Sequence, residues 1–171
     1  MVRVLVIRHA VAFERDRRRW PDDGKRPLTA RGIQKFRKSA RGLARLTQPP
    51  EHVLTSPLVR AVQTAEILTA VSGWPAALET ARLAPGQTTQ QALALVGEHS
   101  ADCLALVGHE PDLSRFVAIA IGGTASRTSI ALKKGGVACL EFGRAVRPGG
   151  AQLMWLATPR LLRALGRASR S

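Results

Sequence analysis

Four side chains that could handle a phosphoryl group lie at or shortly after the ends of apolar, strand-like segments. They are Arg8, His9, Arg60 and His109. A neutral imidazole can attack phosphorus and form a phosphohistidine, and the guanidinium fork of arginine matches the oxygens of a phosphate in pairs. Arginines beside a histidine also disfavour its protonation, which keeps a lone pair available near neutral pH. The sequence therefore predicts a nucleophile, His9, in a phosphate pocket that Arg8, Arg60 and His109 complete.

A sheet must bring these side chains together, because they are far apart in the sequence. Apolar runs of strand length cover residues 2–7, 52–55 and 103–107, and each is followed by polar residues of catalytic type. In open α/β sheets, ligands bind at the carboxyl ends of the strands. We expect the three strand ends to meet at one edge of a sheet and to build the pocket there.

Ser56 and Glu110 complete the expected substrate-binding set. Ser56 is expected first as the N-cap of a helix, with Pro57 at its first position, and second as a pocket residue. Glu110 follows His109 at the start of another helix, where either the pocket mouth or a favourable helix N-terminus would explain an acid. The positive ends of both helices should face the same anion.

Helices alternate with strands along the rest of the chain. Thr29 is expected as an N-cap before a helix that a Pro-Pro pair at 49–50 ends. A Pro-Gly-Gly segment between two late apolar runs predicts a hairpin, and hence an antiparallel strand. Further strands are expected over 77–83, 137–142 and 152–157, further helices over 88–98, 111–121 and 159–168, and a loop over 14–28. The pattern predicts helices on both faces of a mixed sheet.

Length and composition suit one globular domain. The chain has 171 residues, and we expect a single domain over 1–171. No segment approaches the roughly 18 apolar residues that span a bilayer, and no secretion signal is recognised, so the protein is expected in the cytoplasm. Cys103 and Cys139 are too few for a disulfide framework and fit no zinc motif. We expect reduced thiols, no metal and no cofactor.

The formal net charge of +14 favours anionic partners such as phosphorylated proteins, nucleotides, polyphosphate, nucleic acid or an anionic membrane. A solvated, arginine-rich surface would explain the charge equally well. One cluster of cations lies in the segment 14–26, which should overhang the pocket and either steer a phosphoprotein or form a solvated loop. Its members are Arg15, Arg17, Arg18, Arg19, Lys25 and Arg26.

Three motifs resemble the histidine phosphatase (phosphoglycerate mutase-like) superfamily. They are Arg8-His9-Ala10, the segment 56–65 that begins Ser-Pro-Leu-Val-Arg, and Val107-Gly108-His109; segments 26–29, 109–111, 133–136 and 155–159 resemble its compact SixA-type phosphohistidine phosphatase branch. The resemblance implies an α/β fold, a three-layer α/β/α sandwich around a mixed, mostly parallel sheet of about six strands. It also implies that His9 is phosphorylated and that Arg8, Arg60 and His109 bind the phosphate.

Two positions depart from the family pattern. Ala10 stands where most of the superfamily has glycine, which is a minimal change. Pro85 stands two residues after Leu83, where many members have an acid that protonates the leaving oxygen. An alkoxide leaving group needs such a proton, whereas an imidazole is readily protonated near neutral pH. A pocket without the acid should therefore favour P–N bonds, aryl phosphates or anhydrides over alkyl phosphomonoesters.

We expect a phosphatase that acts on protein phosphohistidine, with a phosphorelay or phosphotransferase protein as its partner. A small-molecule or polyphosphate phosphatase would use the same site. A basic nucleic-acid-binding module with a degenerate site is the alternative from another class, although aromatic residues make up only 4 % and no specific binding motif is recognised. No membrane partner is expected. A mutase is not expected, because the sequence has no insertion large enough for a cap.

Overall fold

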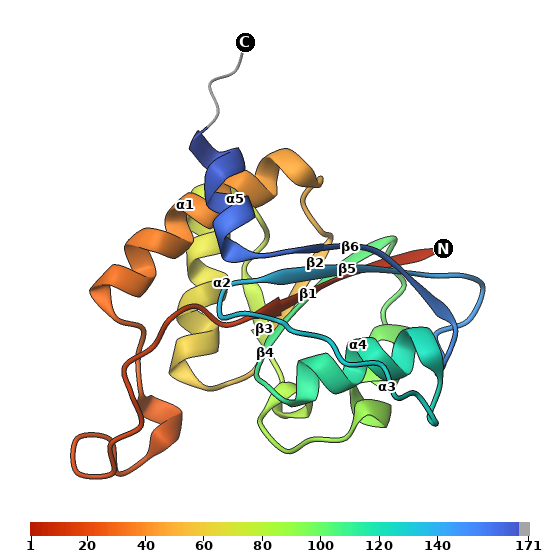
Figure 1. Cartoon of the computed structure of the whole chain (residues 1–171), viewed down its shortest axis with the longest axis horizontal. Helices are drawn as coiled ribbons and strands as arrows, with labels where there is room; N and C mark the ends of the chain where they lie inside the picture. The colour runs from red at the N-terminus through yellow and green to blue at the C-terminus, as the bar shows by residue number, and fades with distance from the viewer. Residues whose placement is uncertain (168–171) are drawn as a thin grey trace.

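The fold is a six-stranded sheet between two layers of helices, seen in a computed structural model that describes residues 1–167 (Figure 1). The strands are β1 (Val2–Arg8), β2 (His52–Thr55), β3 (Ala77–Glu79), β4 (Cys103–Gly108), β5 (Val137–Phe142) and β6 (Ala151–Ala157). The helices are α1 (Ala30–Leu46), α2 (Val59–Ser72), α3 (Thr89–Gly97), α4 (Asp112–Gly122) and α5 (Pro159–Arg167), with 3₁₀ turns at Asp23–Lys25 and Ala81–Leu83.

The sheet is mixed, with the strand order β3-β2-β4-β1-β5-β6. Strands β1 to β4 are mutually parallel, while β5 pairs antiparallel with both β1 and β6. The α/β class, the mostly parallel sheet and the late hairpin are therefore confirmed. Because β2, β4 and β1 are parallel neighbours, their carboxyl ends lie side by side at one edge of the sheet.

Successive side chains of β1 point to opposite faces of the sheet and are apolar on both, which explains why helices cover both faces. Val4 and Val6 belong to the core on the side of α3 and α4, whereas Leu5 and Ile7 belong to the core on the side of α1, α2 and α5. All four side chains are fully buried. A central strand that is apolar on both faces requires such a three-layer arrangement, which Figure 1 shows. None of the helices between residues 1 and 167 has the length and apolar character needed to cross a bilayer.

The helix after β2 differs from the expectation. Helix α2 begins at Val59 with Leu58 as its N-cap residue, and no side chain caps it, so the predicted cap role of Ser56 and the helical position of Pro57 are wrong. The Ser56 hydroxyl instead lies 2.8 Å from Nε2 of His109 and accepts a 3.3 Å hydrogen bond from the Leu58 amide. The hydroxyl is therefore engaged by His109 and by a local turn, and not by the first turn of α2.

Two other elements differ in extent from the expectation. The segment 77–83 contains only the short strand β3, and then a 3₁₀ turn in which the Thr80 side chain accepts from the Arg82 amide. Competition from this side chain ends the extended conformation early. Helix α5 ends the described part of the chain at Arg167, so the expected end at residue 168 lies outside the described residues.

Helices α1 and α5 meet at two glycines. A Cβ atom on Gly42 would collide with the backbone oxygen of Leu162, and one on Gly166 would collide with that of Lys38. Only glycine permits this backbone approach. The close contact fixes the position of α5 on α1, and with it the side chains that the two helices present to solvent.

Candidate active site

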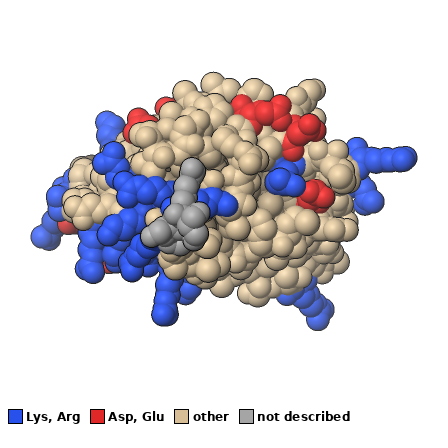
Figure 2. All heavy atoms as spheres, turned by 90° about the horizontal axis from the view of Figure 1, so that it is seen from above, with Lys and Arg blue, Asp and Glu red and all other residues tan. Residues whose placement is uncertain are grey.

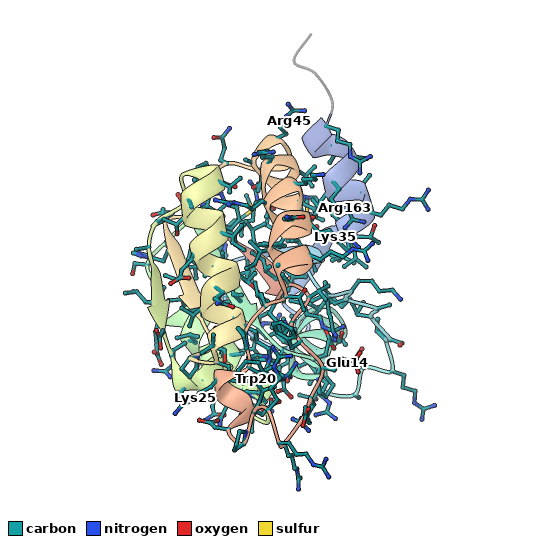
Figure 3. All side chains as sticks on the ribbon, turned by 90° about the vertical axis from the view of Figure 1, so that its left-hand side faces the viewer. Glu14, Trp20, Lys25, Lys35, Arg45 and Arg163 are labelled. Atoms are coloured by element: carbon teal, nitrogen blue, oxygen red, sulfur yellow. The ribbon has the colours of Figure 1, made fainter. Side chains whose placement is uncertain are left out.

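The sheet brings His9 and His109 together at the carboxyl ends of β1 and β4. Residue 8 lies opposite residue 108 in the parallel register, and the His9 amide donates a 3.1 Å hydrogen bond to the Gly108 carbonyl. The two imidazole rings are 5.1 Å apart between centroids, at 54° to each other. Both side chains are buried. Figure 3 views the molecule from this edge of the sheet.

The hydrogen bond of the His9 side chain decides which ring nitrogen has the lone pair. Nδ1 lies 2.7 Å from the Ala10 carbonyl oxygen. A carbonyl oxygen can only accept, so we assign the proton of the neutral ring to Nδ1. The lone pair is then on Nε2. The geometry therefore prepares Nε2 of His9 as a nucleophile.

Burial keeps the His9 ring neutral. It is the main cause that lowers the pKa of His9 to about 4; Arg60, Arg8 and Lys134 lower it further, while the hydrogen bond to Ala10 opposes them. The sequence led us to expect the influence of the arginines, but burial is the larger effect. At pH 7 the ring holds no positive charge, and its lone pair is available.

We expect the imidazole of His9 to titrate with a midpoint near pH 4. The reason is that protonation would place a positive charge in a buried site that already contains two arginines. A ¹⁵N-detected NMR titration from pH 3 to pH 8 measures the midpoint, and the spectrum of a His9→Gln variant identifies the signal. A midpoint above pH 6 would contradict this account of the site.

His109 is also neutral and contributes hydrogen bonding rather than charge. Burial, followed by His9 and Arg60, lowers the pKa of His109 to about 3. Ser56 Oγ accepts a hydrogen bond from a backbone amide, and we assign its own proton to the 2.8 Å hydrogen bond with Nε2 of His109. This arrangement leaves the ring proton on Nδ1, which is buried and has no hydrogen-bond partner among residues 1–167. An N–H donor of this kind suits a phosphate oxygen.

Arg8 and Arg60 each retain unused donors. Arg8 donates through Nη1 to the Leu132 carbonyl at 2.9 Å. Arg60 is 4 % exposed and contacts Asp23 twice, with Nη1 2.8 Å from the backbone oxygen and Nη2 3.2 Å from Oδ2. The Nε atoms of both arginines are buried without a partner in the described part of the chain. Both guanidinium groups can therefore still donate to an oxyanion.

Sequence reasoning missed Asp23, which links the charged segment 14–26 to the site. Its carboxylate contacts Arg60, Arg26 at 2.8 Å and Arg15 at 3.3 Å. Hydrogen bonding from Arg26 is the main cause that holds the pKa of Asp23 well below its usual range. Asp23 thus remains a carboxylate and cannot protonate a leaving group at neutral pH. The only sequence feature that could have indicated a role for Asp23 is that it is an acidic residue in a segment rich in arginine and lysine.

The remaining expected positions lie around this centre. Ser56 belongs to it through its contact with His109. Glu110 is half-buried and its Oε1 atom has no hydrogen-bond partner; across residues 1–167, no hydrogen bond or ion pair joins it to the four central side chains. Pro85 lies in a segment that is tied to α4, because the Gly86 amide donates to Asp112 Oδ2 at 2.7 Å. This segment supplies no acid at position 85.

Between residues 1 and 167, no three His, Cys, Asp or Glu side chains come together in a way that could hold a metal ion.

The sequence matches known proteins at the level of a family. Residues 4–85 match the model of the histidine phosphatase superfamily (branch 1). An uncharacterized protein from Picosynechococcus sp. (strain ATCC 27264 / PCC 7002 / PR-6) is 41 % identical over 142 residues, which cover 81 % of this chain and 84 % of that protein. The high identity over most of both chains indicates common ancestry.

Solved structures share the fold. The protein histidine phosphatase SixA, complexed with tungstate, superposes with a TM-score of 0.80 at 23 % identity, over 93 % of this chain and 98 % of that chain. The mycobacterial glucosyl-3-phosphoglycerate phosphatase in complex with VO3 gives a TM-score of 0.68 at 14 % identity, over 92 % of this chain and all of that chain (100 %). At these identities the likeness concerns the fold alone.

Proposed function

Because this chain belongs to the histidine phosphatase superfamily (branch 1), we propose that it is a phosphatase that acts on protein phosphohistidine through His9. The observation that carries the proposal is a neutral, buried His9, with its lone pair on Nε2, among Arg8, Arg60 and His109. The partner would be a phosphorylated phosphorelay or phosphotransferase protein in the cytoplasm.

The reaction has two displacement steps. Nε2 of His9 attacks phosphorus, a P–N bond to His9 forms, and the P–N bond of the substrate breaks. The substrate imidazole leaves as its nitrogen takes up a proton from solvent. Water then attacks the phosphorus and loses a proton to solvent, the P–N bond to His9 breaks, and inorganic phosphate leaves while Nε2 of His9 regains its lone pair. Each step needs alignment and neutralisation of charge more than covalent assistance.

The surrounding groups have distinct roles in these steps. Arg8 and Arg60 hold the equatorial oxygens of the transferring group, and the Nδ1–H of His109 donates to the same oxyanion. The ring of His9 becomes positive when Nε2 bonds to phosphorus. The Ala10 carbonyl, 2.7 Å from Nδ1, stabilises that charge. We propose that these groups act without a metal ion.

The leaving group supports phosphohistidine as substrate. Position 85 is proline, and Asp23 is held as a carboxylate by Arg26 and Arg60. Neither can donate the proton that an alkoxide requires. An imidazole takes up a proton near pH 6.5 without help from a strong acid. A phosphohistidine side chain therefore suits this site better than a serine or sugar phosphate.

The test compares two peptides of identical sequence that carry phosphohistidine or phosphoserine. We expect kcat/KM for phosphohistidine to be at least about 10²-fold higher, the contribution that a positioned acid would otherwise supply. Stopped assays of phosphate release measure both rates in the presence of EDTA, with an aryl phosphate, a sugar phosphate and polyphosphate alongside. Preference for phosphoserine or the sugar phosphate would refute the assignment, and loss of activity in EDTA would refute the metal-independent mechanism.

A further inference from the structure

A small hollow lies beside the candidate active site, between the N-terminal halves of α1 and α5. Its volume is about 110 Å³, and Ala10, the residue after His9, forms part of its wall. One water molecule takes up about 30 Å³ in the liquid, so a small oxyanion fits there. The position raises the question of what the hollow could bind while His9 handles a phosphoryl group.

The wall of the hollow has positive charges and no acid. Lys35 of α1, Arg163 of α5 and Lys134 line it, whereas no Asp or Glu does. Within the described chain these three cations make no hydrogen bond or ion pair. Other arginines of this protein do find carboxylates, as Arg82 does at Glu98. Three unpaired cations around one concave space make the hollow a suitable binding site for an anion.

The two helices that carry Lys35 and Arg163 pack closely against each other. The glycine contacts at Gly42 and Gly166 fix α5 on α1, which sets the spacing between Lys35 and Arg163. Figure 3 shows these two side chains next to each other, from neighbouring helices. Figure 2, which looks down onto α1 and α5, shows Lys and Arg side chains gathered on one side of this face.

The hollow is also coupled to the nucleophile through the backbone. The Gly135 amide donates to the carbonyl oxygens of Arg8 and His9, at 3.0 and 3.1 Å. Lys134 precedes Gly135, so its backbone is held close to that of His9. In agreement with this, the Lys134 ammonium is one of the groups that lower the pKa of His9.

We propose that the hollow is a second oxyanion site, which binds an acidic group of the same substrate whose phosphoryl group His9 takes. This inference rests on the proposed phosphatase function and extends it to the rest of the substrate. The acidic group can be the carboxylate of an Asp or Glu near the phosphohistidine of a protein, or the second phosphate of a small bisphosphate. Both present oxygens that ammonium and guanidinium groups bind by charge-assisted hydrogen bonds.

The test uses a double variant, Lys35→Ala with Arg163→Ala, and two pairs of substrates. One pair is a phosphohistidine peptide with flanking Asp and Glu, and its analogue with Asn and Gln. The other is a sugar bisphosphate and the matching monophosphate. We expect the intact protein to prefer the more acidic member of one pair, and the double variant to lose at least about 10-fold of that preference in kcat/KM, mainly through KM.

The control is Arg37→Ala, an exposed arginine on the same helix that does not line the hollow. It removes one charge without touching the site, and the preference should persist. Loss of preference for the acidic peptide identifies a protein carboxylate as the occupant, and loss for the bisphosphate identifies a second phosphate. If the double variant has the same preferences as the intact protein, or if Arg37→Ala has the same effect, the second site is refuted.

The second site and the phosphatase function fail in different ways. If the intact protein turns over none of the substrates, the proposed function is refuted. Calorimetry with pyrophosphate and with phosphate then tests anion binding at the hollow without turnover. Tighter binding of pyrophosphate that is lost in the double variant but kept in Arg37→Ala supports the second site, and equal binding by all three proteins refutes it.

Discussion

Replacing His9 with alanine should abolish turnover of a phosphohistidine peptide, with a loss on the order of 10⁴-fold or more. The variant lacks the nitrogen that forms the bond to phosphorus, and no other side chain is expected to replace it. His109, whose ring centroid is 5.1 Å away, has Nε2 engaged with Ser56. The variant should still fold, because the backbone bond from residue 9 to Gly108 does not depend on the side chain.

The decisive measurement is covalent labelling. A peptide with ³²P-phosphohistidine should transfer an acid-labile label to the intact protein on rapid quenching, and none to the His9→Ala variant. His52→Ala is the matched control, since His52 is an exposed histidine on β2 whose ring packs against His99. It should retain both turnover and label. A label of equal intensity in His9→Ala would refute the role of His9 as nucleophile.

Replacing Arg60 with alanine should lower kcat/KM by about 10²- to 10³-fold, the effect typical of removing one preorganised donor from a developing oxyanion. Arg60 is 4 % exposed, so its charge acts in a buried site where water screens it little. Arg60→Lys keeps the positive charge but loses the forked pair of guanidinium donors. Its kcat/KM should lie between that of the intact protein and that of Arg60→Ala. Steady-state kinetics with the phosphohistidine peptide and with an aryl phosphate measure the effect.

A second variant distinguishes two effects of removing Arg60: loss of its contact with the phosphoryl group, and loss of its contact with the segment 14–26. Asp23→Asn removes the carboxylate that binds Arg60, Arg26 and Arg15 but leaves Arg60 in place. We expect a smaller loss of kcat/KM in Asp23→Asn than in Arg60→Ala. If the two variants have equal defects, Arg60 acts by anchoring the loop, and its proposed contact with the phosphoryl group is wrong.

The sequence predicted that Arg8, His9, Arg60 and His109 lie close together, because the strands and the helix that carry them have strong local sequence signals. Apolar runs such as 2–7 and 103–107 indicate buried parallel strands, and the carboxyl ends of neighbouring parallel strands share one edge of a sheet. Arg8, His9 and His109 lie at those ends, and their positions follow from the topology. Arg60 lies in the first turn of α2, the helix that follows β2.

Features that depend on contacts between distant segments could not be predicted in this way. Asp23 reaches Arg60 from a loop that has no hydrophobic period, so nothing local indicates its partner. The expected cap at Ser56 was wrong because the hydroxyl contacts His109, 53 positions away in the sequence. The charge state of His109 depends on its burial. Local preference is a weak guide where tertiary contacts compete for the same polar group.

The central position of β1 determines when the candidate active site can form during synthesis. The strand pairs with β4 on one side and β5 on the other, and both are made much later in the chain. Until the ribosome has released residues up to Phe142, the apolar N-terminal strand lacks its full set of partners. Such long-range pairing is slow and exposes the nascent chain to aggregation. The candidate active site can therefore form only after most of the polypeptide has left the exit tunnel, because His109 and β5 come late in the chain.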